Sequence, residues 1–370
     1  MNFKSYFLSI VSILFVFIFI SCSPRINKAT TAKKVIYPAA PATPRIQYLT
    51  SISSSLDIAK KQSAFTKSIV GKSKILPIYK PYGLFMRNGK LYICDVSLGG
   101  GLEIIDFETN KFSYFAPEGQ YKLKLPLNCY VDENNTLYIA DIALQKIFVF
   151  DGDGIYITSF GKDKNIKPSD VFVNSHNIFV ADSGNNRINV YNKETYKFEY
   201  YFPKSESGDA NYLYKPANLT VTNNKVYVSD MGSGDIKIFT LKGAYLKTIS
   251  KYGKNIGDLV RPKGIAVDKE ENIYVVDASF ENVQIFNKKG ELLLFFGGHY
   301  RSKGDMWLPT KVIIDYDNLK YFKKYVDPKF DLKYLIFVAN QYGPDKVNVY
   351  GRIIPTESKS KIPNEKVKKN

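Results

Sequence analysis

Oxygen-bearing side chains recur at one position of a repeated motif, and their types suggest a ligand site. Asn128, Asp170 and Asn218 each stand two residues after a proline that opens an apolar stretch. Lys311 holds the same position in the last copy of the motif. Carboxylate and amide oxygens are ligands of hard cations such as calcium. Asp170 is the single carboxylate of the set, so we treat the four residues as ligand candidates and expect no resident metal. The alternative is that these polar side chains cap the ends of strands through ordered water.

Residue types suited to catalysis are otherwise sparse. The only histidines are His176, in the turn-like stretch NSHN, and His299, which follows a glycine pair. Two such histidines do not form a metal site or a proton-transfer pair, and the chain has no haem-attachment motif and no phosphate-binding glycine loop. We therefore predict no catalytic residue and no cofactor. The alternative is a lactonase- or lyase-like enzyme with a cation at the residues named above.

A second set of carboxylates recurs at the end of an apolar stretch and could be mistaken for a ring of ligands. An aspartate that ends a strand accepts hydrogen bonds from the N–H groups of the turn that follows. We expect this structural role for Asp95, Asp141, Asp182, Asp230 and Asp277.

Three motifs that occur six times in the same order identify the elements that carry these residues. The first is the proline followed by an apolar strand, as in PLNCYV and PKGIAV; the second resembles LYIAD, and the third resembles IFVF. A fourth apolar stretch ends five of the units. Four short strands in about 40 to 45 residues are typical of a β-propeller blade. The sequence therefore predicts an all-β, six-bladed propeller whose innermost strands surround a central channel, with the candidate residues at its mouth.

The unit from Arg261 to Gly298 resembles the NHL repeat, and so does DSGNNRINVYN from Asp182. The resemblance covers residues 75–354 and implies a six-bladed NHL-type propeller. The chain is also similar to bacterial NHL-type lipoproteins, which implies an association with secreted multihaem cytochrome systems. Some six-bladed enzymes of this kind bind a metal through histidines, and related lactonase-like enzymes bind calcium with a further carboxylate. Neither ligand set can be assembled from the residues of this chain.

The sixth unit lacks a fourth strand, and a lone strand-like stretch near the N-terminus can supply it. The stretch QYLTSIS resembles the fourth strand of another unit, YITSF, so we expect residues 46–53 to close blade six and the propeller to span residues 46–354. Residues 54–71 are predicted to form a helix before blade one. Leu319, Phe322 and Val326 share a face behind Asp317, which predicts a second short helix inserted in blade six.

The N-terminal segment has the features of a lipoprotein leader. Residues 1–21 have the pattern of a signal peptide, and the stretch before Cys22 resembles the bacterial lipobox, so we expect lipidation of Cys22. A plain signal peptide or a retained anchor are the alternatives. Residues 22–45 are predicted to be a Pro- and Lys-rich tether, and residues 355–370 a basic tail. We expect an extracytoplasmic location in the bacterial cell envelope, on the outer membrane.

The formal charge of +17 does not indicate a nucleic-acid partner. Only seven of the 52 basic residues are arginine, the residue favoured for reading phosphates and bases. The excess of lysine has two interpretations. The lysines either cover solvated faces or attract acidic polymers and lipid headgroups. Cys94 and Cys129 lie in apolar strands and are expected to be buried thiols rather than a disulfide. Together these features predict a monomeric scaffold that binds a protein or a surface polymer.

Overall fold

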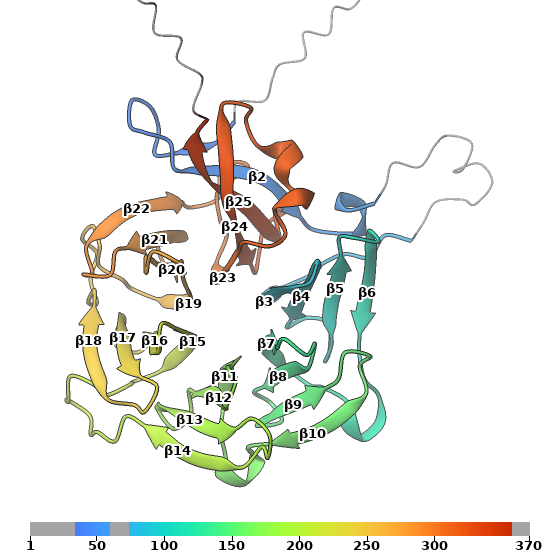
Figure 1. Cartoon of the computed structure of the whole chain (residues 1–370), viewed down its shortest axis with the longest axis vertical. Coiled ribbons are helices and arrows are strands. Elements are labelled where there is room, and N and C mark those ends of the chain that lie inside the picture. Colours follow the sequence, from blue (N-terminus) through green and yellow to red (C-terminus); the bar gives the residue numbers. More distant parts are fainter. Residues whose placement is uncertain (1–33, 60–73, 357–370) are drawn as a thin grey trace, which may run out of the picture. The chain divides into compact units, whose positions relative to one another are not determined.

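The computed structural model describes residues 34–59 and 74–356, and in these residues it contains six antiparallel sheets arranged around a centre (Figure 1). Blades one to three are formed by β3 (Pro81–Arg87), β4 (Lys90–Asp95), β5 (Leu102–Asp106), β6 (Lys111–Phe115), β7 (Pro126–Val131), β8 (Leu137–Asp141), β9 (Lys146–Phe150), β10 (Tyr156–Phe160), β11 (Pro168–Val173), β12 (Asn177–Asp182), β13 (Arg187–Asn192) and β14 (Phe198–Phe202). Each of these blades is built from the innermost strand outward.

Blades four and five follow the same order, and blade six differs because strands from the N-terminal part of the chain complete its sheet. Their strands are β15 (Pro216–Thr222), β16 (Lys225–Asp230), β17 (Asp235–Thr240), β18 (Tyr245–Ile249), β19 (Pro262–Val267), β20 (Ile273–Asp277), β21 (Asn282–Phe286), β22 (Leu292–Gly297), β23 (Pro309–Asp315), β24 (Phe330–Asn340) and β25 (Val347–Pro355). Innermost strands of neighbouring blades contact each other around the ring, including β23 with β3. The predicted all-β six-bladed propeller is confirmed.

Every innermost strand begins with the repeat proline, and this choice has a structural reason. The innermost strand is an edge of its sheet, and proline, which has no N–H to donate, is tolerated at the start of an edge strand. The strand register shifts immediately after each proline, for example between Pro168 and Asp170, so the next residue bulges out of regular pairing. The candidate residues lie at or next to these bulges.

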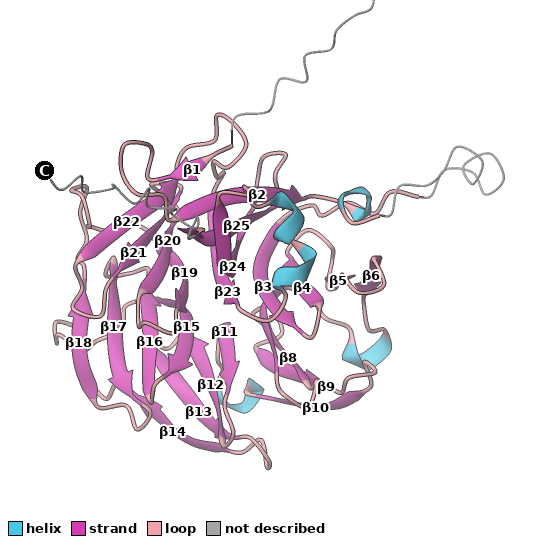
Figure 2. Cartoon of the chain, turned by 45° about the horizontal axis from the view of Figure 1, so that its top comes forward, coloured by secondary structure: helices cyan, strands magenta, loops and turns pink. Residues whose placement is uncertain are grey.

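The N-terminal strand β2 (Ile46–Ile52) completes blade six, as predicted. It pairs antiparallel with β25, from Ile46 opposite Arg352 to Ile52 opposite Val347. Figure 2 shows β2 lying along β25 at the outer side of this blade. Ile46 is buried in the core shared with blade five, and Leu49 and Ile52 are buried in the core shared with blade one. The ring is thus fastened by backbone hydrogen bonds and apolar packing between the two ends of the described chain.

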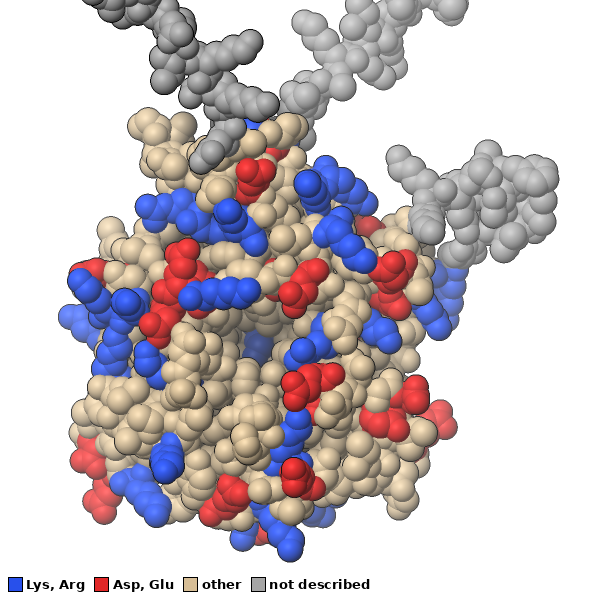
Figure 3. Space-filling model, in the orientation of Figure 1, with Lys and Arg blue, Asp and Glu red and all other residues tan. Residues whose placement is uncertain are grey.

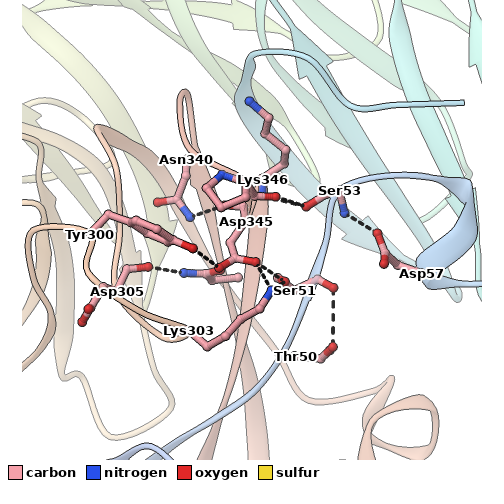
Figure 4. A network of polar contacts seen from close by, with 12 residues as sticks. Thr50, Ser51, Ser53, Asp57, Tyr300, Lys303, Asp305, Asn340, Asp345 and Lys346 are labelled. Atoms are coloured by element: carbon pink, nitrogen blue, oxygen red, sulfur yellow. Dashed lines mark hydrogen bonds and ion pairs between the residues drawn. The ribbon is translucent and has the colours of Figure 1, made fainter.

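A buried carboxylate adds a polar clasp to this closure (Figure 4). Asp345, in the β24–β25 loop, accepts a hydrogen bond of 2.6 Å from Ser51 Oγ on β2. The other oxygen of Asp345 accepts from the Tyr300 hydroxyl at 3.1 Å, and the Lys303 ammonium pairs with the same carboxylate. Ser53 Oγ donates to the backbone oxygen of Pro344 at 2.6 Å. The clasp therefore joins the end of β2 to the β24–β25 loop and to the β22–β23 loop that links blades five and six.

The prediction of a plain tether over residues 22–45 is wrong for its last part. β1 (Ile36–Tyr37) pairs with β2 and becomes the fifth strand of the blade-six sheet. The Tyr37 hydroxyl donates to the backbone oxygen of Gly304 at 3.1 Å, and its ring packs on Phe296. These contacts order a segment whose composition alone suggested an extended linker. Residues 1–33, including Cys22, lie outside the described residues.

Short helical turns lie at both positions where helices were predicted, and they are of the 3₁₀ type. Within the described residues, segment 54–71 contains only the 3₁₀ turn η1 (Ser55–Asp57), and residues 60–73 are not described. The insert in blade six forms two 3₁₀ turns, η4 (Leu319–Tyr321) and η5 (Lys323–Tyr325). Its N-cap is Asn318 rather than Asp317, and Asp315 accepts the hydrogen bonds of Asn318. The i, i+3 spacing of Leu319 and Phe322 suits a 3₁₀ turn as well as an α-helix.

Two further 3₁₀ turns, η2 (Gly119–Tyr121) and η3 (Lys162–Lys164), lie in loops that lead into innermost strands. No helix in the described part of the chain is long and apolar enough to span a membrane.

Removal of β2 is predicted to open the ring. The ladder hydrogen bonds to β25 contribute about 1 kcal/mol each, and burial of Ile46, Leu49 and Ile52 about 1.5 to 3 kcal/mol each. That sum is a large share of the roughly 5 to 15 kcal/mol by which domains are stable. A protein beginning at Ser54 should therefore melt far below one beginning at Lys34, or aggregate through the exposed edge of β25. Differential scanning calorimetry compares them, and equal melting temperatures would show that the ring closes without β2.

Candidate functional site

The predicted ligand residues lie inside the channel rather than at an open mouth. Asn128, Asp170 and Asn218 are buried, and Lys311 is 7% exposed. Two glycines hold the corresponding position in blades one and five because the strands approach closely there. A Cβ on Gly83 would lie 2.3 Å from the Leu127 backbone oxygen, and a Cβ on Gly264 would lie 2.6 Å from the Lys311 Cα. The ring is narrow at this level, which leaves little room for solvent.

A single lysine crosses this narrow level of the channel. The Lys311 ammonium, from blade six, donates to Asp170 Oδ2 of blade three at 2.8 Å and to Asn218 Oδ1 of blade four at 2.7 Å. Blades three and six are opposite each other in a six-bladed ring, so the side chain spans the channel. Asn128 Nδ2 donates to the Ser169 backbone oxygen at 2.7 Å. We call Asn128, Asp170, Asn218 and Lys311 the polar plug.

The electrostatics of the polar plug oppose a role in metal binding. Burial raises the pKa of Asp170, while the Lys311 ammonium and the backbone N–H groups of Leu219 and Val171 oppose that rise. The carboxylate therefore already has a cation and backbone donors around it. No group of three or more histidine, cysteine or acidic residues within the described ranges is arranged to hold a metal ion.

Beside the polar plug lies an aromatic cavity of about 190 Å³. Phe85, Tyr130 and Phe172, from the innermost strands of blades one to three, line one side. The Tyr130 ring centroid lies 4.5 Å from that of Phe85 and 4.7 Å from that of Phe172. A second cavity of about 290 Å³ shares Tyr130 and Phe172 and is bordered by Arg87 and Asp132. One face of the ring is hollowed at its centre, with basic atoms visible at depth (Figure 3). The first cavity is lined mainly by apolar side chains, together with Lys311. The second is lined largely by charged and polar side chains, among them Glu133 and Lys193.

The repeated aspartates tie loops together and are not grouped as ligands. Asp95 accepts from the backbone N–H groups of Tyr79 and Lys80 at 2.7 and 2.8 Å, and from that of Ser97 at 2.8 Å. Each carboxylate thus joins the turn after the second strand to the segment that leads into the first. The same arrangement recurs at Asp141, Asp182, Asp230 and Asp277.

The third strand supplies a buried polar side chain near these aspartates in several blades. In blade three Asn189 Nδ2 donates to Asp182 Oδ2 at 3.0 Å. Blade one has an acid instead, because Glu103 occupies this position beside Asp95. Burial, followed by the charge of Asp95, raises the pKa of Glu103 to about 10. At neutral pH Glu103 is therefore protonated.

The remaining candidate groups do not converge on a site. His176 contacts Ser175 Oγ in an exposed hairpin turn of blade three, and exposed His299 contacts Glu281 in the loops of blades five and six. Cys94 and Cys129 are buried free thiols. Burial raises the pKa of the Cys94 thiol, and the neighbouring Cys129 adds to that rise. Neither thiol is poised as a nucleophile.

One face of the ring carries a surface that the sequence motifs did not predict. Because strands alternate in direction, the loops leading into the innermost strands share a face with the loops between second and third strands, and we call this the upper face. Exposed aromatic side chains gather there: Tyr79, Tyr214, Tyr252, Trp307 and Tyr342. Basic residues directly precede four of the six repeat prolines: Lys80, Lys167, Lys215 and Arg261. The recurring Lys-Pro or Arg-Pro pair was the available signal.

Comparison with known proteins agrees with the fold. Residues 201–342 match a family described as a 6-bladed beta-propeller. A structural genomics protein of unknown function from Bacteroides thetaiotaomicron superposes with a TM-score of 0.57 at 13% identity, covering 84% of this chain and 76% of that one. No curated protein matches the sequence.

Two lyase structures are also similar. Streptogramin B lyase has a TM-score of 0.52 at 13% identity and covers 74% of this chain and 84% of its own. A catalytically inactive virginiamycin B lyase from Staphylococcus aureus, with quinupristin, has a TM-score of 0.51 at 14% identity and covers 74% and 95%. At these identities the likeness shows the fold alone.

Substitution of the plug lysine tests the polar plug. Lys311→Met leaves the Asp170 carboxylate buried without its cation, and breaking a buried pair in this way costs about 3 to 5 kcal/mol. The double variant Lys311→Met/Asp170→Asn removes both charges and should recover part of the loss. Urea unfolding measures both. A cost below about 1 kcal/mol for Lys311→Met would show that the pair is not needed.

The protonated state of Glu103 predicts a dependence of stability on pH. Its folded pKa of about 10 lies above the ordinary value of 4.5, so its stabilising contribution is present below that ordinary value and is lost as pH rises toward 10. Glu103→Gln should remove this loss and gain stability over the wild type as the medium becomes alkaline. Melting temperatures across the pH range measure the difference. Glu118→Gln, an exposed control in the loop that follows blade one, should follow the wild type, and parallel curves for Glu103→Gln would contradict the assignment.

Proposed function

We propose that this propeller is a lipid-anchored binding module of the bacterial cell envelope, and that its upper face holds a protein or a surface polymer. The observation that carries the proposal is the gathering of exposed aromatic and basic side chains on that face. Aromatic and arginine side chains are enriched where proteins bind partners.

The distribution of exposed aromatics is uneven between the two faces. Tyr252 is 66% exposed and Trp307 is 45% exposed, and both lie in loops of the upper face. Among the described residues, the other exposed aromatics are Tyr114 and Phe295, which lie in outermost strands. The loops of the opposite face contribute none within the described ranges. Exposed aromatics concentrated on one face favour a docking surface over scattered surface residues.

The interior supports binding rather than catalysis. A lactonase- or lyase-like reaction in the channel would need a carboxylate free to accept a proton or hold a cation. Asp170 is instead paired with Lys311 and hydrogen-bonded to backbone N–H groups. The similar lyase structures share the fold, and that likeness does not carry a reaction to this chain.

The anchoring part of the proposal rests on the sequence alone. The apolar run from Phe7 to Ile20 followed by Cys22 supports export and lipidation. Mass spectrometry of the mature N-terminus tests this directly: a diacylated or triacylated Cys22 is expected, and an unmodified N-terminal residue other than Cys22 would contradict it.

Site-specific cross-linking tests the role of the upper face. A photoreactive residue in place of Tyr342, on the upper face, should capture a partner in native membranes solubilised with detergent. The same residue in place of Ile157, an exposed position on the outermost strand β10 of blade two, is the matched control and should capture little. Excess unmodified protein should abolish the cross-link at position 342. Equal capture at both positions, or capture that excess protein does not reduce, would overturn the proposal.

A further inference from the structure

One buried lysine on the upper side of the channel has no counter-charge. Three lysines of the described residues are buried. Lys237 pairs with Asp235 at 2.7 Å, and Lys311 pairs with Asp170 at 2.8 Å. Lys263 is only 3% exposed, yet within the described ranges no carboxylate pairs with its ammonium and no acceptor receives a hydrogen bond from it. The first two lysines show how this fold normally satisfies such a group.

The surroundings of Lys263 make the missing counter-charge more significant. Its ammonium lies 5.1 Å from the centroid of the Tyr82 ring, a contact that joins blade five to blade one. Burial, followed by the nearby charges of Arg261 and Lys80, lowers the pKa of Lys263 to about 8. Lys80 in turn lies over the ring of Tyr342. Three cations therefore lie near one another on the upper face, and within the described residues none of their charged groups forms an ion pair with a carboxylate.

The position of Lys263 in the fold places it at the upper entrance of the channel. It follows the repeat proline of β19, one residue before the level of the polar plug. Its backbone oxygen accepts a hydrogen bond from Ser229 Oγ of blade four, which fixes the start of the strand. The equivalent residue of the next blade is the small Thr310, whose hydroxyl donates to the Tyr82 backbone oxygen at 2.8 Å. The lysine therefore reaches past blade six toward Tyr82.

We propose that Lys263, Arg261 and Lys80 form an anion site at the upper entrance of the channel, which binds a carboxylate or phosphate group carried by the partner. Burying an ammonium without a partner is costly, and buried polar groups in proteins are nearly always satisfied. An oxyanion would offset part of this positive charge, and the Arg261 guanidinium can bind it through two N–H groups. The neighbouring exposed ring of Tyr342 would contact the remainder of the ligand.

Isothermal titration calorimetry of the full mature protein tests the site, with inorganic phosphate and succinate as probes and sodium chloride at matched ionic strength as the reference. We expect saturable binding of at least one probe with one site per chain. Lys263→Met should weaken that binding at least tenfold, and Arg261→Gln should weaken it less. Lys254→Gln, an exposed lysine in a loop of the same face, is the control and should bind as the wild type does. Whichever probe binds identifies the source, phosphate or carboxylate.

Thermal stability gives a second readout that does not depend on affinity. Because Lys263→Met removes an unpaired buried charge, the variant should melt higher than the wild type without probe, and the probe should no longer raise its melting temperature. A lower melting temperature for Lys263→Met would show that the ammonium has a stabilising partner, and unchanged probe binding would show that it is not a ligand group. Either result overturns the proposal.

This inference rests on the proposed role of the upper face, and the two can fail separately. Cross-links confined to position 342 with no anion binding would rule out the anion site and leave the proposed binding module in place. Anion binding that depends on Lys263, with equal cross-linking at positions 342 and 157, would keep the anion site and remove the proposed function.

Discussion

Closure of the ring by β2 is the interaction on which the rest of the structure depends. The innermost strands converge only if blade six is complete and packs on blade one. No strand follows β25 within the described residues, so its outer edge would be open without β2. Backbone pairing, the buried Ile46 and Ile52, and the clasp at Asp345 act together at this one seam. A propeller closed in this way resists opening because its first and last strands belong to the same sheet.

A closed ring explains why the channel and the upper face have opposite characters. Inside, the narrow level at Gly83 and Gly264 brings opposite blades within reach of one lysine side chain, and Lys311 neutralises Asp170 there. Outside, the loops that lead into the innermost strands bring exposed aromatic side chains close to Lys80 and Arg261, and neither of these two side chains forms an ion pair within the described residues. Lys263 lies between these regions, buried like Lys311 but without a carboxylate. The groups available to a ligand are therefore those of the upper face.

The fold could be predicted from sequence because its signals are local and repeated. The prolines that open the innermost strands, the aspartates that end the second strands and the lone QYLTSIS stretch each indicate an element by themselves. β1 could not be predicted, because two residues are too few to show an alternating pattern. The 3₁₀ turns of the insert could not be distinguished from an α-helix, because the spacing of Leu319 and Phe322 fits both helix types. Composition also misassigned residues 34–45, which are ordered by contacts with Phe296 and Gly304.

The candidate site was harder to predict than the fold for a geometric reason. Sequence position gives the level of Asn128, Asp170 and Asn218 along the channel, but not the width of the channel at that level. The reach of Lys311 across the ring depends on blades that are far apart in sequence, as does the absence of an acid near Lys263. A buried lysine with a partner and one without a partner look alike in the sequence.

Hydrogen–deuterium exchange of the propeller, with and without the partner captured through position 342, tests the central claim most directly. The account predicts slower exchange in the upper-face loops, above all in residues 297–308 and 340–346 and around Lys80 and Arg261, with no change in the loops of the opposite face. Protection confined to the opposite face, or to the strands around Phe85, Tyr130 and Phe172, would contradict it.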